Sequence, residues 1–286
     1  MARQNNVRQF CWEQILRTNR LFRVSHLFTP SQLSDQLLAL HALFASIELI
    51  SSDISDESVA LRKMSWWRVE LSARQAALSN HPVVSHLHAS GALEKLPQKG
   101  IALLLDSAEA RIDAYAPRDE DQFVKLCQEI YRPQALLELS MGGIDEAIND
   151  SMLINGGIIQ LLRESSRKKE NALWWVPLSL LARFNIRRSD LEALVESEGS
   201  QAVFERVLQS GGSPMSEHLF DRPKSNARGD GHVHLQLMIA LQGRQISRVQ
   251  ATNPAGFRME FSRWHFGDLM STWKYARQLN RSSGAE

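Results

Sequence analysis

The sequence predicts an all-α fold, and three observations support this prediction. Apolar residues recur at helical spacing through most of the 286 residues. Alternating β-branched runs between turn pairs, which would indicate strands, are missing from the sequence. Hydrophobic residues make up 43% of the chain, which is enough for a sizeable core. Because no repeat or change in composition marks a boundary, we expect residues 1–286 to form a single domain.

Charge and cysteine content exclude several classes of protein. The net charge is +1, so the chain lacks the basic excess typical of nucleic-acid-binding proteins. The two cysteines, Cys11 and Cys127, imply no disulfide framework, and a reducing, cytoplasmic setting is expected. No apolar stretch reaches 18 uninterrupted residues, so we expect no transmembrane segment.

The first 30 residues are basic and admit two interpretations. Their charged residues are Glu13 and five arginines, at positions 3, 8, 17, 20 and 23, a composition also found in transit peptides. The alternative is a basic first helix, because apolar residues recur at helical spacing from Phe10 to Leu16. We favour the basic helix, which makes this segment part of the domain.

The first strong helix signal lies at Thr29. This threonine is expected to cap the helix, Pro30 suits the first helical position, and Gln32 completes a capping box. A single apolar stripe follows, formed by Leu33, Leu37, Leu40, Leu43, Phe44 and Ile47.

Helical periodicity continues along the rest of the chain. The predicted helices cover 58–78, 100–116, 119–140, 144–164 and 258–280. In the first of these, four side chains are expected to face inward: Leu61, Met64, Trp67 and Leu71. A capping box at Ser189 opens a further short helix. Six glycines and prolines between 209 and 232 predict a flexible loop.

Several polar groups are candidates for binding. Asp53 and Asp56 would share a helix face and could hold Mg²⁺ if the helix continued that far, although scattered solvated acids are the favoured interpretation. His232 and His234, with His218 upstream, could bind a metal, but in a glycine-rich segment we expect surface side chains.

Basic and aromatic side chains leave two further questions open. The run 167–169, preceded by Arg163, could meet phosphates or form a solvated loop. The tryptophans, Trp67 among them, could line an apolar ligand cavity or pack in the core.

Several blocks of residues, in order along the chain, resemble the squalene/phytoene synthase family. The blocks are 10–13 with 27–30, then 43–45, 52–57 and 66–71, then 109–113 with 123–127, and finally 157–164 with 176–184. The resemblance covers about residues 8–200 and is poor in the C-terminal third. It implies an isoprenoid synthase fold around a central apolar cavity.

The resemblance also implies a metal site. In the enzymes, two facing helices each carry a DxxxD motif, and the acids hold Mg²⁺ ions that grip prenyl diphosphates. In this sequence the first motif falls on Ser52 and Asp56, with Asp53 as the adjacent acid. The positions of the second motif and its surroundings hold Arg163, Glu164, Arg167 and Lys168. Asp53, Asp56 and Glu164 are therefore the metal ligands that remain.

Cations at ligand positions are expected to suppress Mg²⁺ binding. Lys168 replaces a motif aspartate, and a like charge within about 4 Å costs roughly 2–4 kcal/mol at an effective dielectric near 20. An alternative is that Arg167 and Lys168 bind diphosphate directly, with weaker activation of the leaving group. Arg132, at a family glycine position, is expected to narrow or polarise the cavity unless its side chain points outward.

This loss of aspartates resembles one branch of the family, which includes mitochondrial complex I assembly factors. The resemblance implies a non-catalytic or weakly catalytic accessory or assembly factor that needs no cofactor. Its expected ligands are a protein partner and a prenyl diphosphate or isoprenoid lipid, with peripheral membrane association as an extension. The alternative is an active Mg²⁺-dependent prenyl-diphosphate transferase, of squalene or phytoene synthase type, that uses Glu48, Asp53, Asp56 and Glu164.

Overall fold

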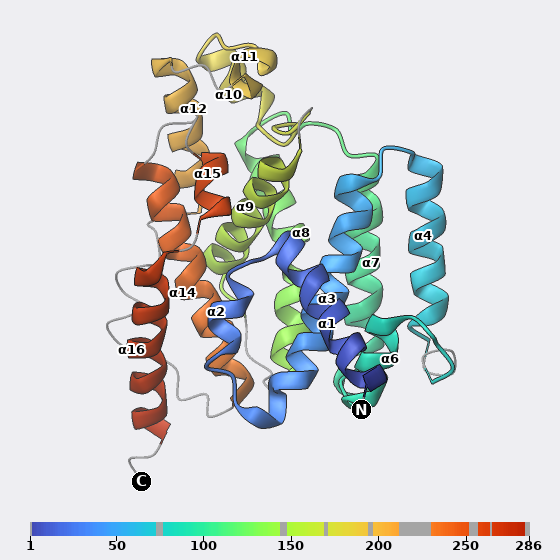
Figure 1. Ribbon diagram of the computed structural model, residues 1–286. Coiled ribbons are helices and arrows are strands. Elements are labelled where there is room, and N and C mark those ends of the chain that lie inside the picture. The colour runs from blue at the N-terminus through green and yellow to red at the C-terminus, as the bar shows by residue number, and fades with distance from the viewer. Residues whose placement is uncertain are drawn as a thin grey trace.

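The computed structural model describes residues 2–72, 77–143, 148–168, 171–193, 197–211, 230–251, 257–263 and 265–283 (Figure 1). Within these ranges every regular element is a helix, which confirms the all-α prediction. The longer helices are α1 (Ala2–Thr18), α3 (Ser31–Asp53), α4 (Glu57–Glu70), α7 (Gln98–Ile112), α8 (Glu120–Met141), α9 (Asp150–Arg167), α12 (Glu198–Gln209), α14 (Asp230–Ala251) and α16 (Phe266–Ser283). The shorter ones are α2 (Phe22–His26), α6 (Pro82–Ala89), η1 (Leu93–Lys95), α10 (Leu178–Arg183), α11 (Arg188–Glu192) and α15 (Phe257–Ser262).

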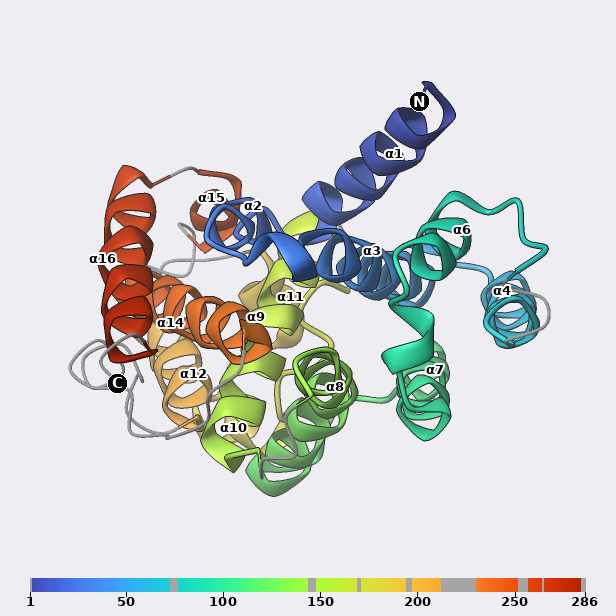
Figure 2. The ribbon, with the colours of Figure 1, turned by 90° about the horizontal axis from the view of Figure 1, so that it is seen from below.

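The long helices form a bundle around α3, α8, α9 and α14. Seen from below, α4 and α7 lie at one edge and α16 at the opposite edge (Figure 2). α8 packs most extensively against α9, and α1 packs against α3. Glycine permits the first of these contacts, because a Cβ at Gly157 would lie 2.3 Å from the carbonyl oxygen of Cys127.

Helix α3 is the central element of the N-terminal half. Leu37, Leu40 and Leu43 on its apolar stripe are fully buried, and each contributes about 1.5–3 kcal/mol of hydrophobic free energy. By length and composition α3 is apolar enough to cross a membrane, but 78% of the relevant stretch is buried inside the bundle. That burial is typical of a core helix. Cys11 and Ile15 of α1 are buried against the same core, as expected for a basic first helix that belongs to the bundle.

Several predicted boundaries are wrong. α4 ends at Glu70 rather than at 78, and Leu61, expected to face inward, is 39% exposed. The predicted C-terminal helix is two helices, α15 and α16. α14 already begins at Asp230, so the end of the predicted 209–232 loop is helical, while 212–229 lie outside the described residues. α9 starts at Asp150 and continues to Arg167, beyond the predicted end at 164.

Two predicted caps are also wrong, for local reasons. The hydroxyl of Thr29 donates to the carbonyl of Ser25 at 3.5 Å, and the extended residue before α3 is Pro30, which offers no side-chain cap. α11 begins one residue before Ser189, after an extended Arg187. The helices with true side-chain caps begin after Asp56, Asp119, Asn149 and Ser197.

Candidate functional site

The C-terminal ends of α3, α7 and α9 meet at one end of the bundle, the upper end in Figure 1. Each helix end carries partial negative charge on its unpaired carbonyl groups, which favours cations in the last turns. Seven side chains gather there and are called the helix-end cluster below: Glu48, Ser51, Ser52, Arg111, Glu164, Arg167 and Lys168. The structure thus brings Ser52 of the first predicted motif beside Glu164, Arg167 and Lys168 of the second, whereas Asp53 and Asp56 lie outside the cluster.

Glu48 is held by an arginine from the opposite helix. Nη2 of Arg167 lies 2.7 Å from Oε1 of Glu48 and donates to Oγ of Ser52 at 3.4 Å. The Glu48 side chain is 9% exposed. Although burial opposes the charge, the carboxylate of Glu48 raises the pKa of Arg167 above its usual value. Arg167 therefore keeps its proton at physiological pH.

Glu164 is neutralised by two cations. Its Oε1 lies 2.9 Å from Nζ of Lys168, one turn further along α9, and its Oε2 lies 3.4 Å from Nη1 of Arg111 on α7. Nη2 of Arg111 also donates to Oγ of Ser51 at 2.6 Å, which ties α7 to α3. Both carboxylate oxygens thus already contact a cation.

Asp53 and Asp56 do not share a helix face, because α3 ends at Asp53. Asp56 is instead the N-cap of α4, where it accepts hydrogen bonds from Oγ of Ser58 at 2.7 Å and from the backbone N–H of Val59 at 3.1 Å. The hydrogen bond from Ser58, and after it the one from Val59, lowers the pKa of Asp56 below its usual value. Asp53 accepts from Oγ of Ser52 at 2.5 Å and lies 3.9 Å from Arg17.

The helix-end cluster does not fit Mg²⁺. An ion there needs free carboxylate oxygens, but Glu48 and Glu164 hold arginine and lysine groups, and Asp56 caps a helix. A unit charge about 4 Å from a fixed cation costs about 4 kcal/mol at an effective dielectric of 20, and Mg²⁺ carries two charges. The cluster therefore lacks the free carboxylates with which the two motifs would hold Mg²⁺.

An arginine-rich pocket adjoins the cluster between α1, the turn that follows it, α9, α14 and α15. Its volume is about 180 Å³, and the arginines that line it are Arg17, Arg20, Arg163, Arg167 and Arg263. Nε of Arg163, and Nε and Nη1 of Arg167, are buried donors without hydrogen-bond partners. Burial lowers the pKa of Arg163, and the charge of Glu48 opposes that shift. Buried donors usually have partners, so these three unpartnered nitrogens are an unusual feature of the two arginines.

Behind this pocket lies a much smaller cavity of about 30 Å³. Most of its lining is polar, including Glu48, Gln134, Gln160, Arg163 and Gln242. The cavity expected from the sequence was apolar, and the polar lining corrects that expectation. Polar residues at buried helix positions are hard to distinguish from surface residues when only the pattern is known, which is why this lining escaped prediction.

The two residues proposed for the cavity lie elsewhere. Arg132 is exposed on α8, 3.9 Å from Asp150, so its side chain points outward as the alternative interpretation had it. Trp67 packs in the core beneath α4 and lines a surface groove of about 450 Å³ between α1, α3 and α4. Sequence reasoning also missed Arg111, whose position at a helix end gave no signal. Arg17 and Arg20 were visible as basic residues but were interpreted only as part of a basic helix.

The comparisons with known proteins agree with this architecture. The squalene/phytoene synthase family profile matches residues 16–214. A crystal structure of a dehydrosqualene synthase has a TM-score of 0.70 at 12% identity, and the alignment covers 98% of each chain. Squalene synthase HpnC from Alicyclobacillus acidocaldarius has a TM-score of 0.57 at 13% identity, with coverage of 99% of this chain and 96% of HpnC. These two likenesses show the fold.

No curated protein sequence matches the chain. The family match nevertheless spans well over half of the chain and nearly coincides with the span of the resembling blocks. The helix arrangement is that of the isoprenoid synthase fold. This protein therefore belongs to the squalene/phytoene synthase family.

Proposed function

We propose that this protein is a non-catalytic or weakly catalytic member of its family that binds an anionic isoprenoid, such as a prenyl diphosphate, through arginines instead of Mg²⁺. In that role it would act as an accessory or assembly factor, as the aspartate-poor branch of the family does. The observation that carries the proposal is the pairing of Glu48 and Glu164 with cations of the chain itself.

The unpartnered donors explain how the anion would be held. Nε of Arg163 and two nitrogens of Arg167 are already desolvated, so a phosphate oxygen would gain charge-assisted hydrogen bonds without a further desolvation cost on the protein side. The planar guanidinium suits bidentate contacts with phosphate. Without a metal ion, these groups bind the diphosphate but stabilise its departure less.

The size of the cavity supports binding over coupling of two substrates. Sites that enclose a drug-sized ligand measure about 300–1,000 Å³. The arginine-rich pocket has about 180 Å³ and the cavity behind it about 30 Å³, which suits a headgroup better than two prenyl chains. No observation on the described residues favours the transferase alternative, since Glu48, Glu164 and Asp56 already have other partners.

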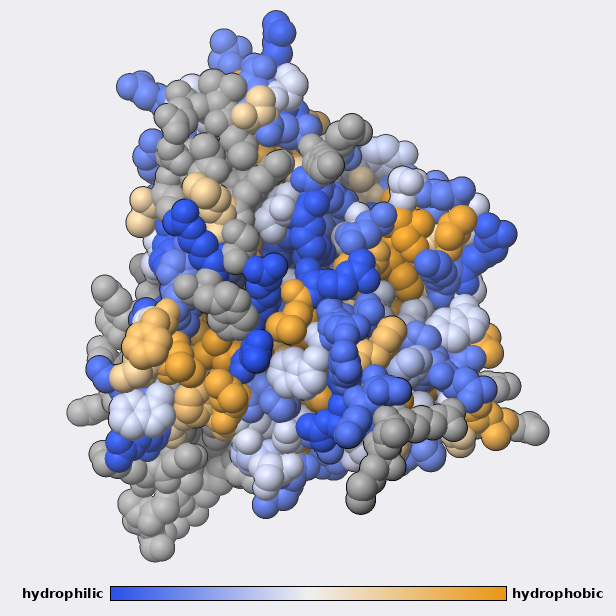
Figure 3. Space-filling view, in the orientation of Figure 1, coloured by the Kyte–Doolittle hydropathy of each residue, from blue (hydrophilic) through white to orange (hydrophobic). Residues whose placement is uncertain are grey.

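An apolar surface supports the accessory role. Leu61, Trp66 and Val69 on α4 are 39%, 41% and 57% exposed. Of these three residues, Trp66 lines the groove between α1, α3 and α4. Apolar side chains also gather on the face seen in Figure 3. Exposed apolar patches of this kind are typical of protein-binding surfaces.

Binding of farnesyl diphosphate and of inorganic diphosphate, measured by calorimetry in EDTA, tests the proposal. We expect binding without Mg²⁺, a loss of at least about tenfold in affinity for Arg167→Gln, and no change for the exposed control Arg132→Gln. Incubation of the wild type with labelled farnesyl diphosphate and Mg²⁺ should yield no squalene or phytoene. Binding that requires Mg²⁺, or efficient product formation, would overturn the proposal.

A further inference from the structure

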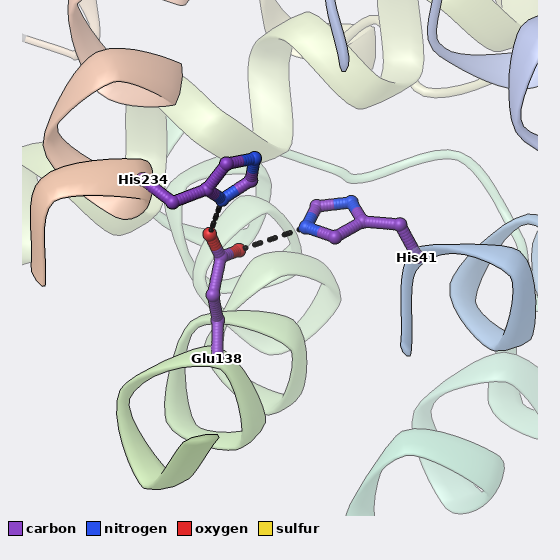
Figure 4. A group of neighbouring side chains, drawn as sticks. All are labelled: His41, Glu138 and His234. Carbon is purple, nitrogen blue, oxygen red and sulfur yellow. Dashed lines mark hydrogen bonds and ion pairs between the residues drawn. The ribbon is translucent and has the colours of Figure 1, made fainter. Parts of the chain in front are cut away.

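A second buried cluster lies deeper in the bundle, away from the helix ends. It consists of His41 on α3, Glu138 on α8 and His234 on α14, and is called the histidine cluster below (Figure 4). The three residues are 8%, 3% and 0% exposed. Figure 4 shows both imidazoles turned toward the carboxylate of Glu138, one from each side. Three helices that are not consecutive in the chain thus converge on one point.

The distances in the histidine cluster are close to those of a metal site. One candidate ligand atom from each residue lies within 4.8 Å of the others. Nε2 of His41 is 3.3 Å from Oε2 of Glu138, and Nδ1 of His234 is 2.5 Å from Oε1. Two ligands of a tetrahedral ion with bonds of about 2.0–2.1 Å stand about 3.3 Å apart. An ion would therefore need an outward shift of His234 from Glu138 and a closer approach of the ligand atoms that stand up to 4.8 Å apart.

The imidazoles are already oriented. Nε2 of His234 lies 3.1 Å from Oγ of Ser25, which leaves Nδ1 facing Glu138. The ring of Phe22 packs against both imidazoles, with centroid distances of 4.4 Å to His41 and 5.4 Å to His234. Metal-binding histidines characteristically have such outer partners, which fix the orientation of the ring.

One donor in the cluster is not satisfied by protein partners. Nε2 of His41 is buried and makes no hydrogen bond, because its 3.3 Å contact with Glu138 lacks hydrogen-bond geometry. A purely structural hydrogen-bond network would be expected to satisfy this atom. The nitrogen points toward the same carboxylate that His234 contacts, as a ligand atom would (Figure 4).

The small cavity supplies room for a further ligand. His41, Glu138, Tyr131 and Gln242 are among the residues that line its approximately 30 Å³, which is enough for a single water. Thr18, Asn19 and Arg163 line both this cavity and the arginine-rich pocket, so the two spaces adjoin and lead toward the surface.

We propose that His41, Glu138 and His234 bind one divalent transition-metal ion of the Zn²⁺ class, with a water in the cavity as the fourth ligand. Two imidazoles and one carboxylate suit Zn²⁺, Fe²⁺, Co²⁺ or Mn²⁺, whereas Mg²⁺ prefers oxygen ligands alone. The bound ion would take the place of the hydrogen bond between Nδ1 of His234 and Glu138. The site is separate from the helix-end cluster and does not depend on the function proposed there.

The test uses the full chain, stripped of metal with a chelator and then titrated with Zn²⁺ alone. We expect one tightly bound ion per chain by elemental analysis after gel filtration. The double variant His41→Gln, His234→Gln should lose at least about a hundredfold in affinity. His86→Gln, which alters another buried histidine on α6, should bind as the wild type does.

A second measurement covers variants that fail to fold. Wild-type protein loaded with Co²⁺ should show the visible absorption of a tetrahedral site with nitrogen and oxygen ligands, and Zn²⁺ should raise its unfolding midpoint by more than about 3 °C. The proposal is overturned if the wild type binds no stoichiometric Zn²⁺. It is equally overturned if the double variant folds and binds Zn²⁺ as tightly as the wild type, because the cluster is then a hydrogen-bonded structural network.

Discussion

The helix-end cluster and the histidine cluster both bury carboxylates beside basic side chains, and both include residues of α3, but the basic side chains differ. At the helix ends the partners are guanidinium and ammonium groups. In the histidine cluster they are two imidazoles. Arginine and lysine keep their protons at physiological pH, so the acids they contact are closed to a metal ion. Imidazole loses its proton near neutrality and becomes a ligand.

The comparison shows that the type of basic side chain beside a buried acid decides whether that acid can bind a metal ion. Surrounding charge alone does not distinguish the two clusters, since each contains acids matched by bases. The helix-end cluster has replaced an ion by fixed side chains, whereas the histidine cluster retains groups that can exchange a proton for an ion. Four experiments test this difference between the clusters, in order of decreasing expected effect.

Removal of the acid from the histidine cluster should be the most damaging change. Glu138→Ala leaves two buried imidazoles without their carboxylate and creates a cavity, so in EDTA we expect the free energy of unfolding to fall by about 3–5 kcal/mol. Urea denaturation measures the loss. Glu129→Ala, on an exposed part of the same helix, should change stability by less than about 0.5 kcal/mol. Equal effects of the two substitutions would contradict the importance of the cluster.

Conversion of the helix-end cations should restore a metal site. The double variant Arg167→Asp, Lys168→Asp frees Glu48, removes one of the two cations that contact Glu164 and adds two acids. Mg²⁺ affinity should therefore rise at least about tenfold, which corresponds to about 1.4 kcal/mol. Calorimetric titration with Mg²⁺ measures the gain. The matched control Arg183→Asp, Arg206→Asp makes the same change of charge around Glu120. A similar gain in the control would mean that overall charge, and not the site, attracts the ion.

Buried histidines outside the histidine cluster provide a comparison, because their burial makes the stability of the protein depend on pH. Burial first of all lowers the pKa of His86 below 6.5, and His26 and His81 are shifted in the same direction for the same reason. As pH falls below 6.5 the unfolded chain takes up protons that the folded chain does not, so stability is full above that pH and is lost below it. His86→Gln should reduce the slope between pH 6.5 and 5.5 by up to about 1.4 kcal/mol per pH unit in urea denaturation. An unchanged slope would show that His86 is protonated in the folded state.

The smallest effect is expected at the former motif acid Asp56. Because it caps α4 from the surface, Asp56→Ala should lower the thermal unfolding midpoint, while Asp56→Asn, which can still cap, should leave the midpoint close to the wild-type value. Differential scanning calorimetry distinguishes the two variants. If both variants lose stability equally, the charge of Asp56 matters and the capping role is insufficient.

The sequence predicted the helical class and most long helices because apolar periodicity records which face is buried. Its alternative metal site joined Glu48 and Glu164 to Asp53 and Asp56, and of these four the first two lie in the helix-end cluster. The contact of Arg111 with Glu164 was not predicted, since no local pattern records which helix ends meet in space. The sequence left open whether the helix continued past Asp53, and the structure ends α3 there, before an extended Ile54.

His234 is the most instructive error. Its neighbours in the sequence are glycines and another histidine, and this composition favoured a surface loop. In the structure it lies within α14 and is fully buried against residues from α2 and α8. The partners that give His234 its meaning stand 96 and 209 positions away, beyond the reach of any local pattern.

Helix α3 contributes to both clusters, and its buried members His41 and Glu48 are seven residues or about two helical turns apart. A helix behaves as a stiff rod over about 10 Å, so an ion that fixes His41 also fixes the rotation and depth at which Glu48 meets Arg167. Any anion held by Arg167 would then be sensed at the histidines. Thermodynamic reciprocity then requires each ligand to change the affinity for the other by the same factor, so α3 would couple the metal ion to the anion.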